Sequence, residues 1–200
     1  IDCGAIFYSG EKIIDVKDVP IVGNHNLQNV MCSVIAAKIA GIKTDDITGA
    51  IKTFKAPAHR CEFIRMLDDT AYYNDSKATN PEASIVAINS FEGKKVVLIA
   101  GGRDKNTSLG EFIKSVKERI SKVVLIGEAT ERFMDELYNS GYTNIVHAQS
   151  LEEAIDLASL DKSDVVLLSP ACASFDMFKN YEERGEAFRR YVLSKKQLVS

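Results

Sequence analysis

The sequence predicts an α/β fold built on a doubly wound, mostly parallel sheet, and three observations indicate it. Short apolar segments alternate with helix-like segments over about residues 58–200. The apolar segments, such as 96–100 and 165–168, are hydrophobic at successive positions, which is typical of parallel strands buried on both faces. Turn residues separate the segments, as Gly141 does after one helix-like segment. We therefore expect a Rossmann-like domain with helices on both faces of its sheet.

The segment before residue 58 shows a different pattern. Loosely alternating apolar residues on either side of Gly10 predict a β-hairpin with a glycine turn. Apolar residues recur every three or four positions over 27–39, which predicts a helix. A second helix is expected from Thr44, as its N-cap, to Phe54. Pro57 ends this pattern, so we expect one domain boundary there.

In the second part, strands are predicted from apolar runs and helices from their capping residues. Asn80 followed by Pro81, and Ser150 with Glu153 as a capping box, are typical helix starts. Strands are expected at 71–73, 95–100, 123–126, 145–147 and 165–168, and helices from Asn80, over 108–120, over about 130–138, from Ser150 and at the C-terminus.

Composition excludes several classes of protein. With 25 basic and 28 acidic residues the formal net charge is −3, and no basic cluster predicts nucleic-acid binding. No apolar run approaches the ~20 residues of a membrane-spanning helix. The start, Ile1 to Gly4, lacks both a Met and the features of a signal peptide, so we expect it to be a cut point in a longer protein.

The cysteines indicate a reducing compartment. The four cysteines are scattered without C-x-x-C spacing, so no metal site is expected and a cytoplasmic location is favoured. Cys172 lies in a polar motif, but no His is close to it in the sequence. We expect it to pack rather than to act as a nucleophile.

Polar segments follow three of the expected strands, at 74–80, 101–105 and 169–176. Ligands of open α/β sheets bind at the carboxyl ends of strands, so these loops are the first candidates for a site. After the Gly101-Gly102 turn, Lys105 supplies a cation that suits a carboxylate or a phosphate.

Each of these residues also has an interpretation without function. A lysine at such a place is often only solvated, and Ser174 or Thr79 could be a simple helix cap. Asp75 and Lys77 could form a surface ion pair worth at most about 1 kcal/mol. Neither a G-x-x-x-x-G-K-[ST] phosphate loop nor a G-x-G-x-x-G motif occurs, so we expect any triphosphate-binding loop to lie elsewhere.

Taken together, the motifs along the chain resemble the Mur ligase family. Within that family, Asn-Asp-Ser-Lys-Ala-Thr-Asn at 74–80 and Ser-Pro-Ala-Cys-Ala-Ser-Phe-Asp at 169–176 resemble the branch that adds D-glutamate. The resemblance covers nearly the whole chain, in the family's order. The motifs that carry it are Gly23 to Asn29, Ala58-His59-Arg60 with Glu62, Asn74 to Asn80, Gly101-Gly102 to Lys105, Leu167 to Phe178, and Asn180 to Glu186.

The resemblance implies an ATP-dependent, amide-forming ligase of peptidoglycan precursor synthesis. The carboxylate of UDP-N-acetylmuramoyl-L-alanine would become an acyl phosphate, which the amine of D-glutamate attacks. Residues 1–57 would be the end of the central ATP-binding domain, and 58–200 the whole C-terminal amino-acid-binding domain. The phosphate loop and most Mg²⁺ ligands would lie upstream. We expect a monomer that acts on small molecules, and no ligase activity from these 200 residues alone.

The resemblance also implies roles for individual residues. Lys77 would act near the phosphates as a catalytic residue. Asn26 and Asn29 would contact the adenine side, and Arg60 and Asp75 the nucleotide. The D-glutamate pocket would be formed by Thr79, Lys105, Ser174, Phe175 and Tyr181, although core packing is an alternative for the two aromatic residues.

Two other functions fit the same sequence. One is a ligase of the same family that adds a different amino acid, and the D-glutamate pocket distinguishes it. The other is a non-catalytic module that binds a nucleotide or an amino acid, which predicts tight binding by the isolated chain. The residues do not indicate which group would deprotonate the incoming amine.

Overall fold

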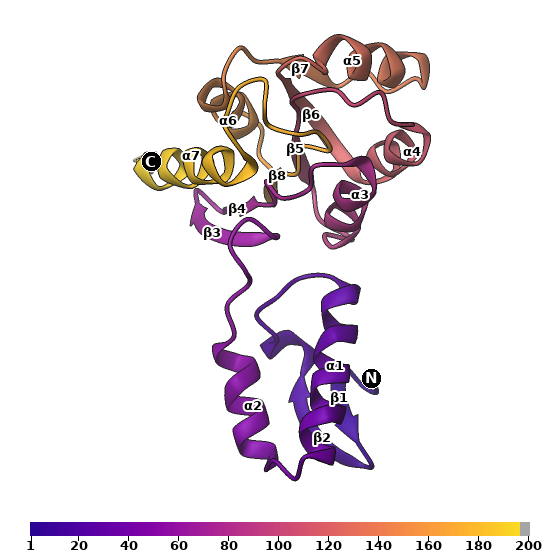
Figure 1. The fold of residues 1–200 in the computed structure, drawn as a ribbon, viewed down its shortest axis with the longest axis vertical. Coiled ribbons are helices and arrows are strands. Elements are labelled where there is room, and N and C mark those ends of the chain that lie inside the picture. Colours follow the sequence, from indigo (N-terminus) through magenta and orange to yellow (C-terminus); the bar gives the residue numbers. More distant parts are fainter. Residues whose placement is uncertain (197–200) are drawn as a thin grey trace. The chain divides into compact units, whose positions relative to one another are not determined.

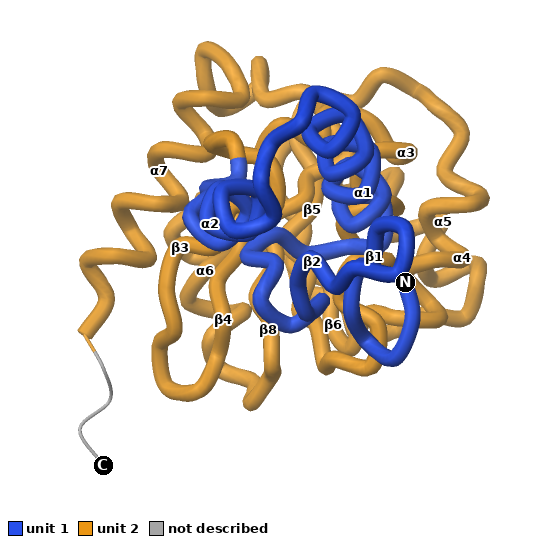
Figure 2. Tube along the Cα trace, turned by 90° about the horizontal axis from the view of Figure 1, so that it is seen from below, with its two compact units in different colours: residues 1–56 blue, residues 57–200 orange. Residues whose placement is uncertain are grey.

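The computed structural model describes residues 1–196. The chain forms two compact units, unit 1 (Ile1–Ala56) and unit 2 (Pro57–Ser200) (Figure 2). In the described part of the chain, no helix is long and apolar enough to cross a membrane. The assignment of the two units to an ATP-binding and an amino-acid-binding domain stays a prediction.

Unit 1 is a β-hairpin that packs against two helices. Its core consists of side chains from the hairpin and from both helices, namely Ile6, Ile13, Ile14, Val34 and Ile47. The predicted hairpin and helices are confirmed. The elements are β1 (Ala5–Tyr8), antiparallel to β2 (Glu11–Asp15), a 3-10 turn η1 (Val16–Asp18), α1 (Asn24–Ile39) and α2 (Thr44–Thr53).

The prediction that Thr44 caps α2 is wrong. Thr44 is the first residue of the helix, and the N-cap position belongs to Lys43, which makes no capping hydrogen bond with its side chain. The Thr44 hydroxyl instead donates to the carboxylate of Glu11 on β2 and accepts from the amino group of Lys38. The Lys38 ammonium therefore takes the place of a backbone amide as the donor to the Thr44 hydroxyl, and the Glu11 carboxylate accepts the hydroxyl proton.

Unit 2 is a six-stranded sheet with helices on both faces, which confirms the predicted α/β fold. The strand order is β3-β4-β8-β5-β6-β7, in which only β3 is antiparallel to its neighbour. The elements are β3 (Glu62–Leu67), β4 (Thr70–Asn74), α3 (Pro81–Asn89), β5 (Val96–Gly101), α4 (Gly110–Arg119), β6 (Ile120–Ile126), α5 (Thr130–Asn139), β7 (Ile145–His147), α6 (Leu151–Ser159), β8 (Val165–Leu168) and α7 (Tyr181–Ser194).

The two faces of the sheet explain why its strands are apolar at every position. Val97 and Ile99 of β5 belong to a buried cluster with α6 and α7. Leu98, which lies between them, is equally buried and points to the opposite face because side chains alternate along a strand. Figure 1 shows α6 and α7 on one side of the sheet and α3 and α4 on the other.

Local capping fixes where three helices begin. The side chains of Asn80, Ser150 and Asn180 accept hydrogen bonds from amides three residues later, at 2.8, 3.1 and 2.7 Å. The predicted starts at Asn80 and Ser150 are confirmed. The helix predicted over 108–120 is shorter, since Ile120 already pairs with Val96 in the sheet.

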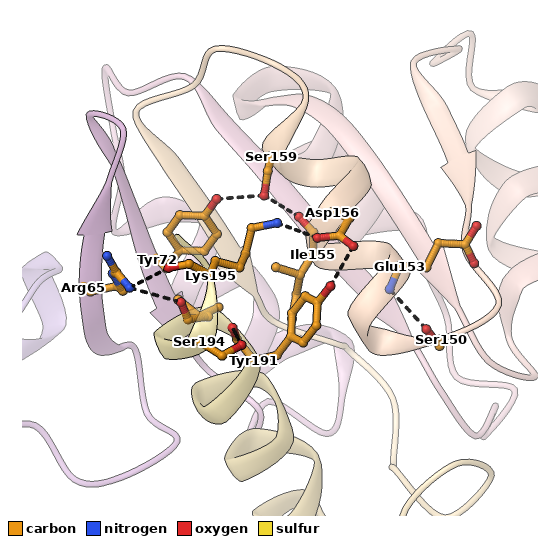
Figure 3. Close-up of polar contacts among 11 residues, drawn as sticks. Arg65, Tyr72, Ser150, Glu153, Ile155, Asp156, Ser159, Tyr191, Ser194 and Lys195 are labelled. Atoms are coloured by element: carbon orange, nitrogen blue, oxygen red, sulfur yellow. Dashed lines mark hydrogen bonds and ion pairs between the residues drawn. The ribbon is translucent and has the colours of Figure 1, made fainter. Parts of the chain in front are cut away.

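The helix α7 is held by polar contacts at its C-terminal half. The Tyr191 hydroxyl donates to Asp156 of α6 (2.7 Å), and Arg65 of β3 donates to the carbonyl oxygens of Leu193 and Lys195 (both 3.2 Å) (Figure 3). The first residue of α7 is Tyr181, which belongs to the candidate site. The contacts at the C-terminal half therefore help to hold the helix that carries this residue.

Candidate functional site

Asp75 is buried at the end of β4 and connects two of the candidate loops. Its carboxylate accepts from the Cys61 amide (3.1 Å) and from the Ser169 hydroxyl (2.7 Å), which follows β8. Burial raises the pKa of Asp75 to about 6, against the hydrogen bonds from Ser169 and Cys61 and the nearby charge of Arg60, all of which lower it. In the described residues it forms no ion pair with Lys77, so the surface-pair interpretation is wrong.

Lys77 lies beside Tyr181. Its amino group is 5.3 Å from the centroid of the Tyr181 ring, a distance at which a cation is attracted to an aromatic face. His59 packs edge-on against the same ring at 6.1 Å between centroids, and its carbonyl oxygen accepts from the Lys77 amide (3.1 Å). The fold thus brings the proposed catalytic lysine and one residue of the proposed D-glutamate pocket together.

His59 is held in place from three sides. Its Nδ1 lies 3.0 Å from Nδ2 of the buried Asn74, and its amide donates to the Glu62 carboxylate (3.1 Å). A Cβ at Gly185 would lie 2.2 Å from Nδ1 of His59, so only glycine leaves room for the ring. These contacts also fix the backbone next to Arg60, whose side chain is exposed at the same edge of the sheet.

Lys105 and Thr79 meet across two neighbouring loops. The Lys105 amino group donates to the carbonyl oxygen of Thr79 (3.3 Å), and the Lys105 side chain is otherwise exposed. An exposed ammonium group held at the carboxyl edge of the sheet can bind a carboxylate.

The loop after β8 lies against the glycine turn after β5. Gly101 and Gly102 have φ angles of +112° and +133°, and Cβ atoms there would lie 2.0 Å from the Ile126 oxygen and 2.3 Å from the Ala173 oxygen. The Arg103 amide donates to that same Ala173 oxygen (2.8 Å). The absence of side chains therefore lets two site loops touch through their backbones.

Ser174 and Phe175 of this loop differ in exposure. Ser174 is buried, and its carbonyl oxygen accepts from the amides of Met177 and Phe178 (3.1 and 2.8 Å). Phe175 is 66% exposed, so core packing does not explain it. An exposed aromatic ring at the candidate site is available to a ligand.

Arg184 is a central residue that the sequence did not single out. It is 1% exposed, and its guanidinium donates to both the hydroxyl and the carbonyl oxygen of Ser76 (2.9 Å each) and to the carbonyl oxygens of Cys172 (3.1 Å) and Ala173 (3.3 Å). Burial lowers its pKa to about 10. Arg184 thereby joins the loops after β4 and β8. A signal existed, because Arg184 continues the buried stripe of Phe188 and Val192 at a spacing of four.

Cys172 packs, as expected. Burial raises the pKa of its thiol to about 12, so the thiolate form that a nucleophile requires is scarce near neutral pH. Within residues 1–196 no group of three or more His, Cys, Asp or Glu side chains could hold a metal ion.

The two proposed adenine contacts belong to unit 1. The Asn26 side chain donates to the Val22 carbonyl oxygen (2.7 Å), which stabilises the turn into α1. Asn29 is exposed and lines a cleft of about 240 Å³. The other residues around this cleft are mostly apolar: Val19, Pro20, Ile21, Val30, Ser33, Ala50, Ile51 and Phe54.

Comparison with known proteins identifies the family. Residues 59–172 match the model for "Mur ligase, glutamate ligase domain". The chain is 42% identical over 194 residues to a UDP-N-acetylmuramoylalanine–D-glutamate ligase of Caldanaerobacter subterraneus, covering 95% of this chain and 43% of that protein. The protein of the same name from Pelotomaculum thermopropionicum is 43% identical over 94% of this chain and 41% of its own length. The chain thus spans less than half the length of these relatives.

Solved structures show the same fold at low identity. A UDP-N-acetylmuramate-alanine ligase of Thermotoga maritima has a TM-score of 0.62 at 19% identity, over 88% of this chain and 39% of that one. A folylpolyglutamate synthase of the same organism has a TM-score of 0.63 at 15% identity, over 94% and 42%. The matched family model and the curated relatives together show that this chain belongs to the Mur ligase family.

Proposed function

We propose that the chain is the C-terminal part of an ATP-dependent ligase that adds D-glutamate to UDP-N-acetylmuramoyl-L-alanine. The observation that carries the proposal is the meeting of Lys105 with Thr79 at the carboxyl edge of the sheet. The names of relatives that are 42% and 43% identical support the choice of amino acid.

The proposed D-glutamate pocket uses the three loops that converge at this edge. Lys105 would bind a carboxylate of D-glutamate, with Thr79 beside it and Ser174 on the loop after β8. Phe175 and Tyr181 would border the ligand with their rings. A pocket of this kind holds a dicarboxylate in a fixed orientation and leaves its amine free to attack an acyl phosphate.

The nucleotide would lie on the side of Lys77 and Arg60. Both are exposed cations beside the His59 backbone, where they can stabilise phosphate charge. Both Asp75 carboxylate oxygens already accept hydrogen bonds from the protein. We therefore propose that Asp75 acts on the nucleotide mainly by fixing this loop, while Asn26 and Asn29 contact the adenine.

ATP and Mg²⁺ are the proposed cofactors, and we place the phosphate loop and most Mg²⁺ ligands in the part of the relatives' length that this chain does not cover. Mg²⁺ would neutralise phosphate charge during acyl transfer. We further propose a monomeric, cytoplasmic enzyme of peptidoglycan precursor synthesis, in keeping with the four free cysteines of the chain.

A substitution in the full-length protein tests the D-glutamate pocket. Lys105→Ala should raise the KM for D-glutamate about tenfold or more, because a charge-assisted hydrogen bond is worth about 1.5–3 kcal/mol. The KM for ATP should stay nearly unchanged. Lys114→Ala on α4 removes another exposed lysine and serves as the matched control. Unchanged D-glutamate kinetics in Lys105→Ala would contradict the assignment.

A second test concerns the chain by itself. We expect these 200 residues to show no turnover with ATP, UDP-N-acetylmuramoyl-L-alanine and D-glutamate, because positioning and charge stabilisation require all parts of the site together. Phosphate release by the purified chain is compared with that of the full-length protein. Release above the enzyme-free rate that depends on D-glutamate would overturn this expectation.

A further inference from the structure

We propose that Arg132 on α5 is a positioning residue for Lys105, acting through the loop between β5 and α4. The inference rests on the proposed function, in which Lys105 binds D-glutamate. Arg132 itself would not touch the ligand. It would hold the loop on which the Lys105 backbone lies, and so direct the lysine toward Thr79.

The proposal rests on a bidentate ion pair between Arg132 and Asp104. Arg132 donates from Nε to one carboxylate oxygen of Asp104 (2.5 Å) and from a terminal nitrogen to the other (2.7 Å). The two side chains are 29% and 15% exposed. A bidentate pair of this kind fixes direction as well as distance, which a lysine in place of the arginine could not do. In keeping with it, the hydrogen bond from Arg132 holds the pKa of Asp104 below its usual value.

The same arginine contacts the loop on both sides of Lys105. Besides Asp104, it donates to the carbonyl oxygen of Thr107 (3.2 Å). The Asp104 carboxylate also accepts from the Asn106 amide (2.9 Å), and Asn106 has a φ of +53°. Lys105 therefore lies within a tight turn whose neighbouring residues are bound directly or indirectly to one side chain of α5.

The rest of this turn lies at the surface. Residues 105–108 are exposed, and the next buried side chain along the chain is that of Leu109. A second ion pair, Arg103 with Glu128 (2.7 Å), has both side chains about half exposed, and such pairs contribute little. The Arg132–Asp104 pair is bidentate and less exposed than the Arg103–Glu128 pair, so it restrains the backbone at Lys105 more strongly than that pair does.

The experiment measures steady-state kinetics of the full-length protein. Because a displaced Lys105 would lose its charge-assisted hydrogen bond to a carboxylate of D-glutamate, we expect Arg132→Ala to raise the KM for D-glutamate by about tenfold. The kcat and the KM for ATP should change by less than about twofold, because Arg132 touches neither the nucleotide loop nor the acyl group. Arg132→Lys keeps the positive charge but cannot form the bidentate pair with Asp104. This variant should therefore show a smaller rise in the KM for D-glutamate than Arg132→Ala.

Two comparisons separate positioning from general stability. In a Lys105→Ala background, Arg132→Ala should cause no further rise in the D-glutamate KM, since residues that act through one another are not additive. The matched control is Arg119→Ala, which removes an arginine of similar exposure (32%) and breaks its longer ion pair with the more exposed Glu92 (3.6 Å). It should leave both KM values unchanged. Thermal unfolding of each variant shows that it is folded.

The outcomes distinguish this inference from the proposed function. If Lys105→Ala raises the D-glutamate KM and Arg132→Ala does not, the positioning role is wrong and the function stands. The positioning role is also wrong if Arg132→Ala raises the KM for D-glutamate equally in the presence and in the absence of Lys105. Such a result would show that Arg132 acts independently of Lys105. If Lys105→Ala itself has no effect, both the proposed pocket and the role of Arg132 fail.

Discussion

Asp75 and Arg184 are two opposite charges buried at the same edge of the sheet, and neither forms a salt bridge in the described part of the chain. Each is instead surrounded by neutral hydrogen-bonding groups: Asp75 by an amide and a hydroxyl, Arg184 by a hydroxyl and carbonyl oxygens. Buried charges of this kind cost desolvation energy, which their pKa shifts reflect. They connect loops rather than stabilise the core.

The buried carboxyl of Asp75 makes a pH-dependent contribution to stability. Its folded-state pKa of about 6 lies above the ordinary value of 3.8, so the folded state binds the proton more tightly than the unfolded state. Protonated Asp75 therefore favours folding below about pH 4, and this contribution is lost as pH rises through about 6. The shift corresponds to about 3 kcal/mol.

Asp75→Asn should remove this pH dependence. Relative to the variant, the unfolding free energy of the unchanged chain should fall by about 2.5 kcal/mol between pH 4 and pH 8. Urea unfolding of both proteins at several pH values measures the difference. A difference that is constant over this range, or that changes in the opposite direction, would show that Asp75 is not protonated preferentially in the folded state.

At the scale of elements, the contact between the turn after β5 and the loop after β8 depends on Gly102. Gly102→Ala would place a Cβ 2.3 Å from a backbone oxygen at a φ of +133°. We expect a loss of about 2–5 kcal/mol of unfolding free energy, from backbone strain and from overpacking together. Urea unfolding of the chain measures it, and a loss below about 1 kcal/mol would show that the loops can separate easily.

Gly110→Ala is the matched control for this substitution. A Cβ at Gly110, the first residue of α4, meets nothing within 4 Å, and its backbone angles suit any residue. This change should be neutral or stabilise the chain by up to about 1 kcal/mol, since alanine favours the helix. The pair of variants therefore separates the geometry of the turn from the general effect of replacing a glycine.

Elements with strong local signals could be predicted from the sequence, whereas β3 could not. The parallel strands are uniformly apolar, and the helices after Asn80 and Ser150 start at capping residues. β3 is an edge strand that exposes Phe63 and Met66 (49% and 50%) and carries charged residues. β3 is joined to β4 by the two-residue turn Asp68-Asp69, in which both φ angles are positive, as in the favoured hairpin turns. This pair of aspartates is the local feature of the sequence that marks the hairpin.

Sequence alone also could not show which polar side chains meet. Motif order and strand-end position placed Thr79, Lys105 and Ser174 at one edge of the sheet, but contacts between residues far apart in the chain depend on the folded backbone. The spacing of Arg184 with Phe188 and Val192 indicates a buried position, although an arginine on a helix is ordinarily solvated, and it does not show which groups the guanidinium binds. Only the packing of α7 against two loops shows that its guanidinium is enclosed.

At the scale of the whole molecule, each compact unit has a hydrophobic core of its own. The cluster under α6 and α7 contains only residues of unit 2, and the cluster of the hairpin contains only residues of unit 1. We therefore predict that residues 57–200 fold when produced without residues 1–56. Their urea unfolding should be cooperative, with a free energy within about 0.5 kcal/mol of the corresponding transition in the whole chain. Hydrogen exchange of the β5 and β8 amides, which lie at the centre of the buried sheet, gives a second measurement. Broad unfolding together with weak protection of these amides would mean that unit 2 requires unit 1 to fold, and that the boundary near Pro57 does not separate independent domains.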